Sequence, residues 1–99
     1  MKTYSIYQIT DTSKDAYYIK FCGLDVLKRL GLKPTKNIYS KVYEGYIKDS
    51  DTILDDIYYK FNMKHPEDFK GHSLSVSDVV ELDGKFYYCD SYGWTEIWK

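Results

Sequence analysis

The segment VVELDGKFYYC, residues 79–89, decides the fold of this chain. An Asp-Gly pair between two strand-like runs is a strong signal for a β-hairpin, because its turn adopts the positive φ angles that match the twist of the strands. With Asp83 and Gly84 in the turn, Val79 faces Tyr88 across the hairpin. Both faces of this hairpin are mostly apolar. We therefore expect it inside a sheet rather than at an edge.

Several further segments have the composition of strands, which is rich in Tyr, Ile, Val and Thr. They are residues 2–10, 16–21, 37–47 and 95–99. Gly45, inside the third of them, indicates a bulge or a bend. A chain of 99 residues has room for one hydrophobic core, so we expect a single domain over residues 1–99. The predicted fold is α+β: a small, mostly antiparallel β-sheet of about four or five strands, with two α-helices packed on it.

The first helix is expected from GLDVLKRLGL, residues 23–32. Leu24, Leu27 and Leu30 would share one side of it. Gly31 is a typical C-terminal glycine, since it can adopt the left-handed conformation that ends a helix.

The second helix is expected from KDSDTILDDIYYKFN, residues 48–62. Its apolar positions recur at helical spacing and form one stripe. The stripe consists of Ile53, Leu54, Ile57, Tyr58 and Phe61. Asp49, Ser50 or Asp51 can cap the N-terminus, because a short polar side chain accepts hydrogen bonds from the first free N–H groups. Phe69 is expected to anchor the loop that follows this helix.

The charge balance argues against direct nucleic-acid binding. Fourteen basic and fifteen acidic residues leave a net charge of -1, and Arg29 is the only arginine. No apolar run approaches the length of a bilayer span and no leader pattern opens the chain, so we expect a cytoplasmic protein without membrane contact. Cys22 and Cys89 then stay reduced. No spacing typical of a metal site occurs, and we expect neither a metal nor a cofactor.

Tyrosine is over-represented, with twelve residues in the chain. Doublets occur at residues 17–18, 58–59 and 87–88. In a doublet on a strand one ring faces inward and the other outward, so several phenol rings must be exposed. Exposed tyrosines are typical of protein interfaces, and a small core filled with aromatic side chains is the equally open alternative.

The segment GHSLSVSD, residues 71–78, has the residue types of a hydrolase site but not their arrangement. If extended, its three serines share one face and His72 points to the other, and no glycine-flanked nucleophile elbow surrounds a serine. We interpret the segment as a turn into the hairpin, in which short polar side chains bond the local backbone. The residues assigned this structural role are Gly71, His72, Ser73, Ser75, Ser77, Asp78, Asp83, Gly84, Cys89 and Asp90.

Other catalytic pairings are also weak. Cys89 with His72 or His65 could form a thiolate pair, but a cysteine in the middle of a strand is by default buried and inert. Asp78 and Asp90 flank the hairpin and could meet in space, yet a lone acidic pair is little evidence for acid–base catalysis. We therefore predict that the protein is not an enzyme and has no catalytic residues.

A family resemblance follows from the order of these segments. They are YSIYQIT, GLDVLKRLGL, KVYEGYI, DTILDDIYYKFNMKHPEDFKGHSLSVSDVVEL and YYCDSYGW. In this order they resemble the YodL-like domains carried by conjugative and other mobile genetic elements of Firmicutes. The resemblance spans nearly the whole chain and implies a stand-alone copy of a module met near antirestriction-type proteins. It implies no catalytic role for the matching residues Gly71, His72, Ser73, Ser75, Ser77, Asp78, Cys89, Asp90 and Ser91.

The resemblance and the surface together suggest a non-enzymatic module that binds a host protein. The most concrete version is an antagonist of host immunity, anti-CRISPR or antirestriction, that binds a nuclease effector. The acidic helix start, with Glu44, could imitate the spacing of phosphates, although contacts through tyrosine and tryptophan are favoured. The candidate partner-binding residues are Asp49, Asp51, Asp55, Asp56, Tyr59, Trp94 and Trp98. For the two tryptophans, locking the C-terminal segment onto the sheet is the favoured alternative.

Two rival functions stay open. One is a scaffold or assembly domain of conjugation or plasmid maintenance, which could form a homodimer through a sheet edge. The other is a hydrolase that uses Cys89 or Ser73 with His72.

Overall fold

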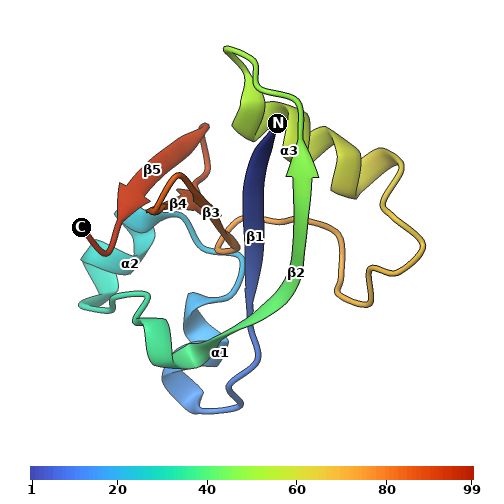
Figure 1. Ribbon diagram of the computed structural model, residues 1–99. Helices are drawn as coiled ribbons and strands as arrows, with labels where there is room; N and C mark the ends of the chain where they lie inside the picture. The colour runs from blue at the N-terminus through green and yellow to red at the C-terminus, as the bar shows by residue number, and fades with distance from the viewer.

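The structure is a computed structural model that describes residues 1–99. Its elements are, in chain order, β1 (Lys2–Ile9), α1 (Lys14–Ile19), α2 (Leu24–Leu30), the short 3-10 helix η1 (Lys36–Ile38), β2 (Tyr39–Ile47), α3 (Ile53–Met63), β3 (Val79–Leu82), β4 (Lys85–Cys89) and β5 (Trp94–Ile97) (Figure 1). The five strands form one antiparallel sheet in the order β2-β1-β3-β4-β5. The predicted α+β class is confirmed, with one helix more than expected.

The β3–β4 hairpin has the predicted register. Val79 lies opposite Tyr88, and the turn residues Asp83 and Gly84 have φ angles of 54° and 76°. Two consecutive positive φ angles are those of a type I′ turn, which explains the Asp-Gly pair. β3 also pairs with β1, so the hairpin lies inside the sheet.

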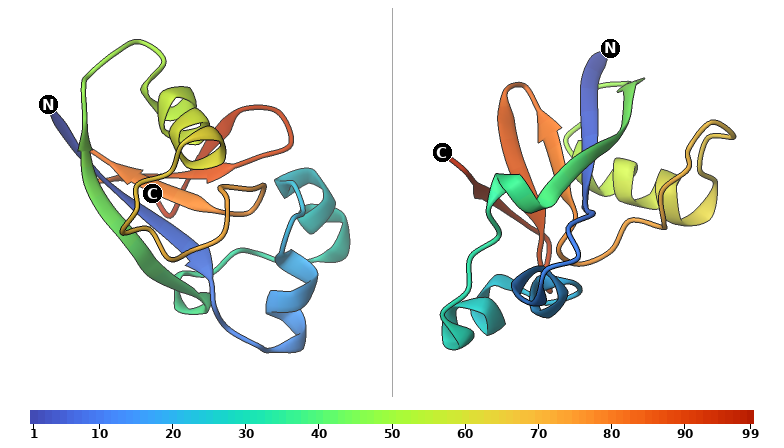
Figure 2. Two further views of the ribbon diagram at one scale, coloured as in Figure 1. Left: turned by 90° about the vertical axis from the view of Figure 1, so that its right-hand side faces the viewer. Right: turned by 90° about the horizontal axis from the view of Figure 1, so that it is seen from below.

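Each face of the sheet is covered by different helices. One core cluster joins Ile57 and Phe61 of α3 to strand residues that include Val80. The other joins α1 and α2 to residues that include Val79. Adjacent strand residues point to opposite faces, so the Val-Val pair of β3 contributes to both cores. Figure 2 shows α1 and α2 together at one end of the molecule, apart from α3.

The short strand predicted at residues 16–21 is wrong, because this segment contains α1. The hydroxyl of Ser13 accepts a hydrogen bond from the Ala16 N–H group at 3.3 Å, which caps the helix. Ala16 and Ile19, three residues apart, are the buried positions. The tyrosine doublet between them therefore points away from the core as a pair, and the cap and helical spacing outweigh the strand preference of tyrosine.

In α2, Gly31 ends the helix with φ at 73°, as predicted. Leu27 is fully buried, whereas Leu30 is 57% exposed. Of the three leucines expected on one side of this helix, Leu27 is therefore the buried one, and Leu24 packs partly against the same core.

The expected stripe of α3 is present, with Ile57 and Phe61 buried. The predicted cap is wrong: Thr52 occupies the cap position rather than Asp49, Ser50 or Asp51. The carbonyl of Thr52 accepts the first helical hydrogen bond, from the N–H group of the residue four positions on, at 2.8 Å.

Gly45 does not mark the bulge. The register of β1 and β2 shifts between Ile6 and Tyr7, opposite Val42. A Cβ atom on Gly45 would lie 3.0 Å from the Tyr4 hydroxyl, so this glycine makes room for the Tyr4 ring.

Residues 71–78 form a loop with a turn at residues 76–77 that leads into β3, which confirms the predicted turn. Phe69, the predicted anchor of the preceding loop, is buried. None of the helices has the length and apolar character that crossing a bilayer requires.

Candidate functional site

Four polar residues connect the loop of residues 71–78 to β1 and to the end of α1. We call Gln8, His72, Ser77 and Asp78 the polar hub. Asp78 is 2% exposed, and its carboxylate accepts hydrogen bonds from the Ser75 N–H group at 2.8 Å and from Gln8 Nε2 at 3.2 Å. Burial raises the pKa of Asp78 to about 6, against the lowering effect of these hydrogen bonds and of His72.

Gln8 is the centre of the polar hub. Its amide also donates to the backbone carbonyl of His72 at 2.8 Å. A Cβ atom on Gly71 would lie 2.4 Å from Gln8 Oε1 and 2.8 Å from Phe69 Cζ, so only glycine fits beside these two side chains. Gly71 and Asp78 therefore share Gln8, a residue of β1, as a neighbour.

Three hydrogen bonds of Ser77 connect its loop to β4, to β2 and to the segment that follows α1. Its backbone N–H group donates to Cys89 O at 2.9 Å, and its carbonyl accepts from the Tyr39 hydroxyl at 2.6 Å. Its side-chain hydroxyl accepts from the Phe21 N–H group at 3.1 Å. Ser77 itself has a φ of 87°, an unfavourable conformation for a residue with a side chain. The surrounding hydrogen bonds hold it there.

The contact with Ser77 fixes an exposed aromatic residue. Phe21 directly follows the end of α1, has a φ of 66° and is 66% exposed. Tyr17 and Tyr18 are 72% and 48% exposed, and their ring centroids are 5.8 Å apart. The Phe21 ring also lies 6.3 Å from the imidazole of His72. We call Tyr17, Tyr18 and Phe21 the α1 aromatic face.

The carboxylate of Asp90 has a different role from that of Asp78. Asp90 accepts hydrogen bonds from the N–H group of Leu24 at 3.0 Å and from the Thr95 hydroxyl at 2.9 Å. It thus supplies the cap of α2, whose cap residue is a glycine without a side-chain oxygen. The Asp78 and Asp90 carboxylates bind separate sets of partners and do not form an acid–base pair.

The contacts of Cys89, His72 and the neighbouring Ser75 define the surroundings of the candidate hydrolase residues. Cys89 is 4% exposed, and burial raises the pKa of its thiol to about 12, so the thiolate is scarce at neutral pH. The hydroxyl of Ser75 donates to the carbonyl of Ser73 rather than to an imidazole. Nδ1 of His72 lies 2.7 Å from that same carbonyl and 3.9 Å from Asp78 Oδ2.

Cys22 and Cys89 are both free thiols. No cluster of three or more His, Cys, Asp or Glu side chains has metal-binding geometry.

The acidic candidate residues divide into two pairs. Asp55 accepts a hydrogen bond from the indole N–H of Trp94 at 3.1 Å, and Asp56 accepts from the Ser50 hydroxyl at 2.6 Å. Asp49 and Asp51 are exposed and make no ion pair. Only Asp49 and Asp51 are therefore free to contact a partner without losing an internal hydrogen bond.

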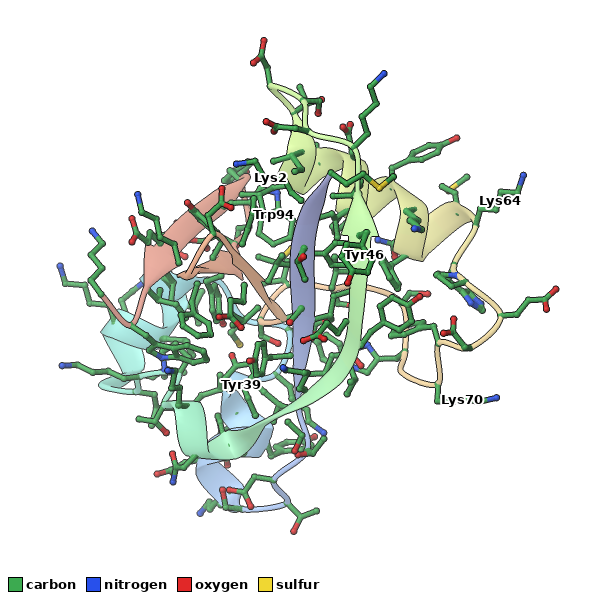
Figure 3. All side chains as sticks on the ribbon, in the orientation of Figure 1. Lys2, Tyr39, Tyr46, Lys64, Lys70 and Trp94 are labelled. Atoms are coloured by element: carbon green, nitrogen blue, oxygen red, sulfur yellow. The ribbon has the colours of Figure 1, made fainter.

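The two tryptophans bind the rest of the fold, at different places. The indole of Trp98 donates to Pro34 O at 2.6 Å, and its ring contacts Tyr39 at a centroid distance of 5.3 Å. Figure 3 shows Trp94 near the upper end of the sheet and Tyr39 near the lower end. These contacts lock the C-terminal segment in place. Tyr59, on the outer side of α3, is 66% exposed.

Sequence reasoning did not find Gln8 or the α1 aromatic face. Gln8 lies 64 residues from His72 in the chain, and no local pattern connects them. The signal for α1 was the Ser13 cap with Ala16 and Ile19 three residues apart, which the tyrosine-rich composition obscured.

Comparison with known proteins gives one match. The family model of the YodL-like domain matches residues 3–99, nearly the whole chain. No curated protein and no solved structure matches.

Proposed function

The chain belongs to the YodL-like domain family, and from this premise we propose that it is a non-enzymatic module that docks on a host protein through the α1 aromatic face. The exposed rings of Tyr17, Tyr18 and Phe21 carry this proposal, and the two tyrosine rings pack against each other at a centroid distance of 5.8 Å. Aromatic side chains bury a large area at low entropic cost and are enriched at binding hot spots.

The backbone at Phe21 supports the same conclusion. A φ of 66° costs free energy for a residue with a Cβ atom, on the order of 1 kcal/mol. That cost brings Phe21 no burial, because the ring is 66% exposed. The Ser77 hydroxyl holds the Phe21 backbone in this conformation, so docking of the exposed ring requires less ordering of the main chain.

The more specific proposal is antagonism of host immunity, with a CRISPR or restriction nuclease as the partner. The mobile-element context suggested by the family resemblance motivates it. Imitation of nucleic acid has less support, because Asp55 and Asp56 are held by internal hydrogen bonds and the net charge is only -1. Blocking of the effector through aromatic contacts is the favoured mode.

A pull-down with the tagged protein tests both levels of the proposal. Lysates that contain CRISPR and restriction effectors supply the partners, and mass spectrometry identifies them. The Tyr17→Ala/Phe21→Ala variant should lose a specific effector by at least tenfold, because each lost hot spot costs roughly 1–2 kcal/mol. Tyr92→Ala is the matched control, since Tyr92 is 97% exposed and lies outside α1.

Purified effector then provides the decisive measurement. If the double variant binds the effector as tightly as the wild type does, the α1 aromatic face is not the docking site. Binding of a protein that is not an immune effector would keep the docking site and remove the antagonist function.

A second function, an assembly domain of conjugation or plasmid maintenance, has one supporting observation. β2 is an edge strand of nine residues, Tyr39–Ile47, and pairs only with β1. Such an edge can pair with another chain. The bulge opposite Ile6 and Tyr7 twists this edge, which makes it the weaker candidate.

A further inference from the structure

A groove with an excess of lysine lies where the C-terminal end of β5 meets the segment that joins α2 to η1. Its volume is about 740 Å³, within the range typical of ligand sites. We call it the lysine groove. Its lining includes Lys33, Lys36, Lys99, Ile97, Trp98 and Glu96.

The positive charges of the lysine groove have no internal partners. The chain has three Lys or Arg ion pairs, which involve Lys2, Arg29 and Lys41. The ammonium of Lys36 instead lies 4.3 Å from the centre of the Phe86 ring. An anion that enters the groove would therefore gain these charges without breaking an existing salt bridge.

The walls of the groove are held in position before any ligand binds. The indole N–H of Trp98 donates to Pro34 O at 2.6 Å, which joins the two walls. Trp98 has a φ of 53°, and its ring contacts Phe86 at a centroid distance of 5.2 Å. Ile97 adds apolar surface beside the indole. The groove thus suits a peptide that offers carboxylates together with apolar side chains.

The chain itself contains such a peptide. The acidic segment, residues 48–56 with the sequence KDSDTILDD, comprises the connection from β2 and the first turn of α3, and the connection projects from the top of the molecule in Figure 1. It carries four aspartates together with Ile53 and Leu54, which pack against the core of their own molecule and keep part of their surface exposed. Asp49 and Asp51 are exposed and unpaired, so the segment has free charge opposite in sign to that of the groove.

We propose that the lysine groove binds the acidic segment of a second copy of this chain. The two surfaces lie on different sides of one molecule, so a single copy cannot bring them together (Figures 1 and 2). Charge complementarity selects a protein occupant over a nucleic acid, because the fifteen acidic residues of the chain, Glu96 of the groove among them, repel a phosphate backbone. This inference is independent of the proposed function, since neither surface includes the α1 aromatic face.

Sedimentation velocity over a range of concentrations of the full chain tests the proposal. Association should weaken at least about tenfold between 0.1 M and 1 M salt, because the Debye length falls from about 10 Å to about 3 Å. Lys33→Glu/Lys36→Glu should weaken it by at least about tenfold, and Asp49→Lys/Asp51→Lys should do the same. The chain that carries all four changes should associate again, within about threefold of the wild type, because the charges are exchanged across the contact.

The control is Lys14→Glu/Lys70→Glu, which makes the same charge change at exposed lysines outside the groove. It should leave association unchanged, and circular dichroism should show that every variant is folded. Monomers at every concentration at low salt would overturn the proposal. So would association that both charge-reversed variants retain, which would place the contact elsewhere, for example at the β2 edge. Failure of the fourfold variant to recover would equally refute the pairing of these two surfaces.

Discussion

Replacing the buried carboxylate of the polar hub should change how stability depends on pH. Asp78 is 2% exposed, and its pKa is raised from 3.8 to about 6, chiefly by burial. The native state therefore binds more protons than the unfolded chain between about pH 4 and pH 6, and this group makes the protein less stable as pH rises through that window. A difference of 2.2 pKa units corresponds to about 3 kcal/mol.

The Asp78→Asn variant removes this titration and keeps the shape of the side chain. Its amide oxygen can still accept from the Ser75 N–H group, which now lies 2.8 Å from the carboxylate. The free energy of unfolding of the variant minus that of the wild type should therefore rise by about 2 kcal/mol from pH 4 to pH 7, because the unfolded carboxyl is already partly ionised at pH 4. Urea unfolding followed by tryptophan fluorescence measures it at each pH.

Two further variants make this test specific. In Asp51→Asn, the altered side chain is exposed and without an ion pair, so the difference from the wild type should stay constant with pH. In the wild type, the charge of His72 lowers the pKa of Asp78. The His72→Ala variant lacks that charge, so the pH range over which stability falls should extend to higher pH. A difference for Asp78→Asn that is flat, or that falls as pH rises, would refute the reasoning, since the buried carboxylate would then be stabilised by its hydrogen bonds more than it is destabilised by burial.

Four other substitutions have defined outcomes, each measured by urea unfolding at neutral pH. Tyr4→Phe should stabilise the protein by about 1 kcal/mol, because the Tyr4 hydroxyl is buried without a hydrogen-bond partner. The matched change Tyr39→Phe should instead destabilise the protein by about 1–2 kcal/mol, because it leaves the buried carbonyl of Ser77 unpaired. Equal effects of the two would contradict the assignment of their hydrogen bonds. Gly71→Ala should cost about 1–3 kcal/mol through contact with the buried side chains of Gln8 and Phe69, and a neutral result would mean that the loop shifts freely. Gly84→Ala should cost about 1 kcal/mol through backbone strain alone, since its φ is 76° and no atom lies within 4 Å of the added Cβ.

The parts of the fold that depend on neighbours in sequence could be predicted from it. The β3–β4 register follows from the two-residue turn at Asp83 and Gly84, and the end of α2 follows from Gly31. α1 could not be predicted as easily, because a helix of six residues is stabilised by one cap and two buried side chains rather than by its composition. Tyrosine preference alone then indicates the wrong element.

The polar hub shows why contacts between residues far apart in the sequence could not be predicted. Gln8 contacts Asp78 across 70 residues of sequence, and only the pairing of β1 with β3 brings them together. The sequence marked Asp78, Ser77 and Gly71 as structural, but it offered no reason to connect them with Gln8 or Phe21. The lysine groove is a similar case, because Lys36 and Lys99 lie 63 residues apart in the sequence.

The residues that hold the fold together differ from the residues that are exposed for binding. The motif residues of the polar hub hold β1 and the loop before β3 together, so changing Gly71 or Asp78 tests folding first. The side chains of the α1 aromatic face and the lysines of the lysine groove are exposed and lie outside that motif, so changing them tests binding more directly. Two contacts link the polar hub to the α1 aromatic face: the Ser77 hydroxyl holds the backbone of Phe21, and the His72 imidazole lies 6.3 Å from the Phe21 ring. An effect of the hub on partner binding would therefore have to pass through the position of Phe21, and the Tyr17→Ala/Phe21→Ala background should abolish it.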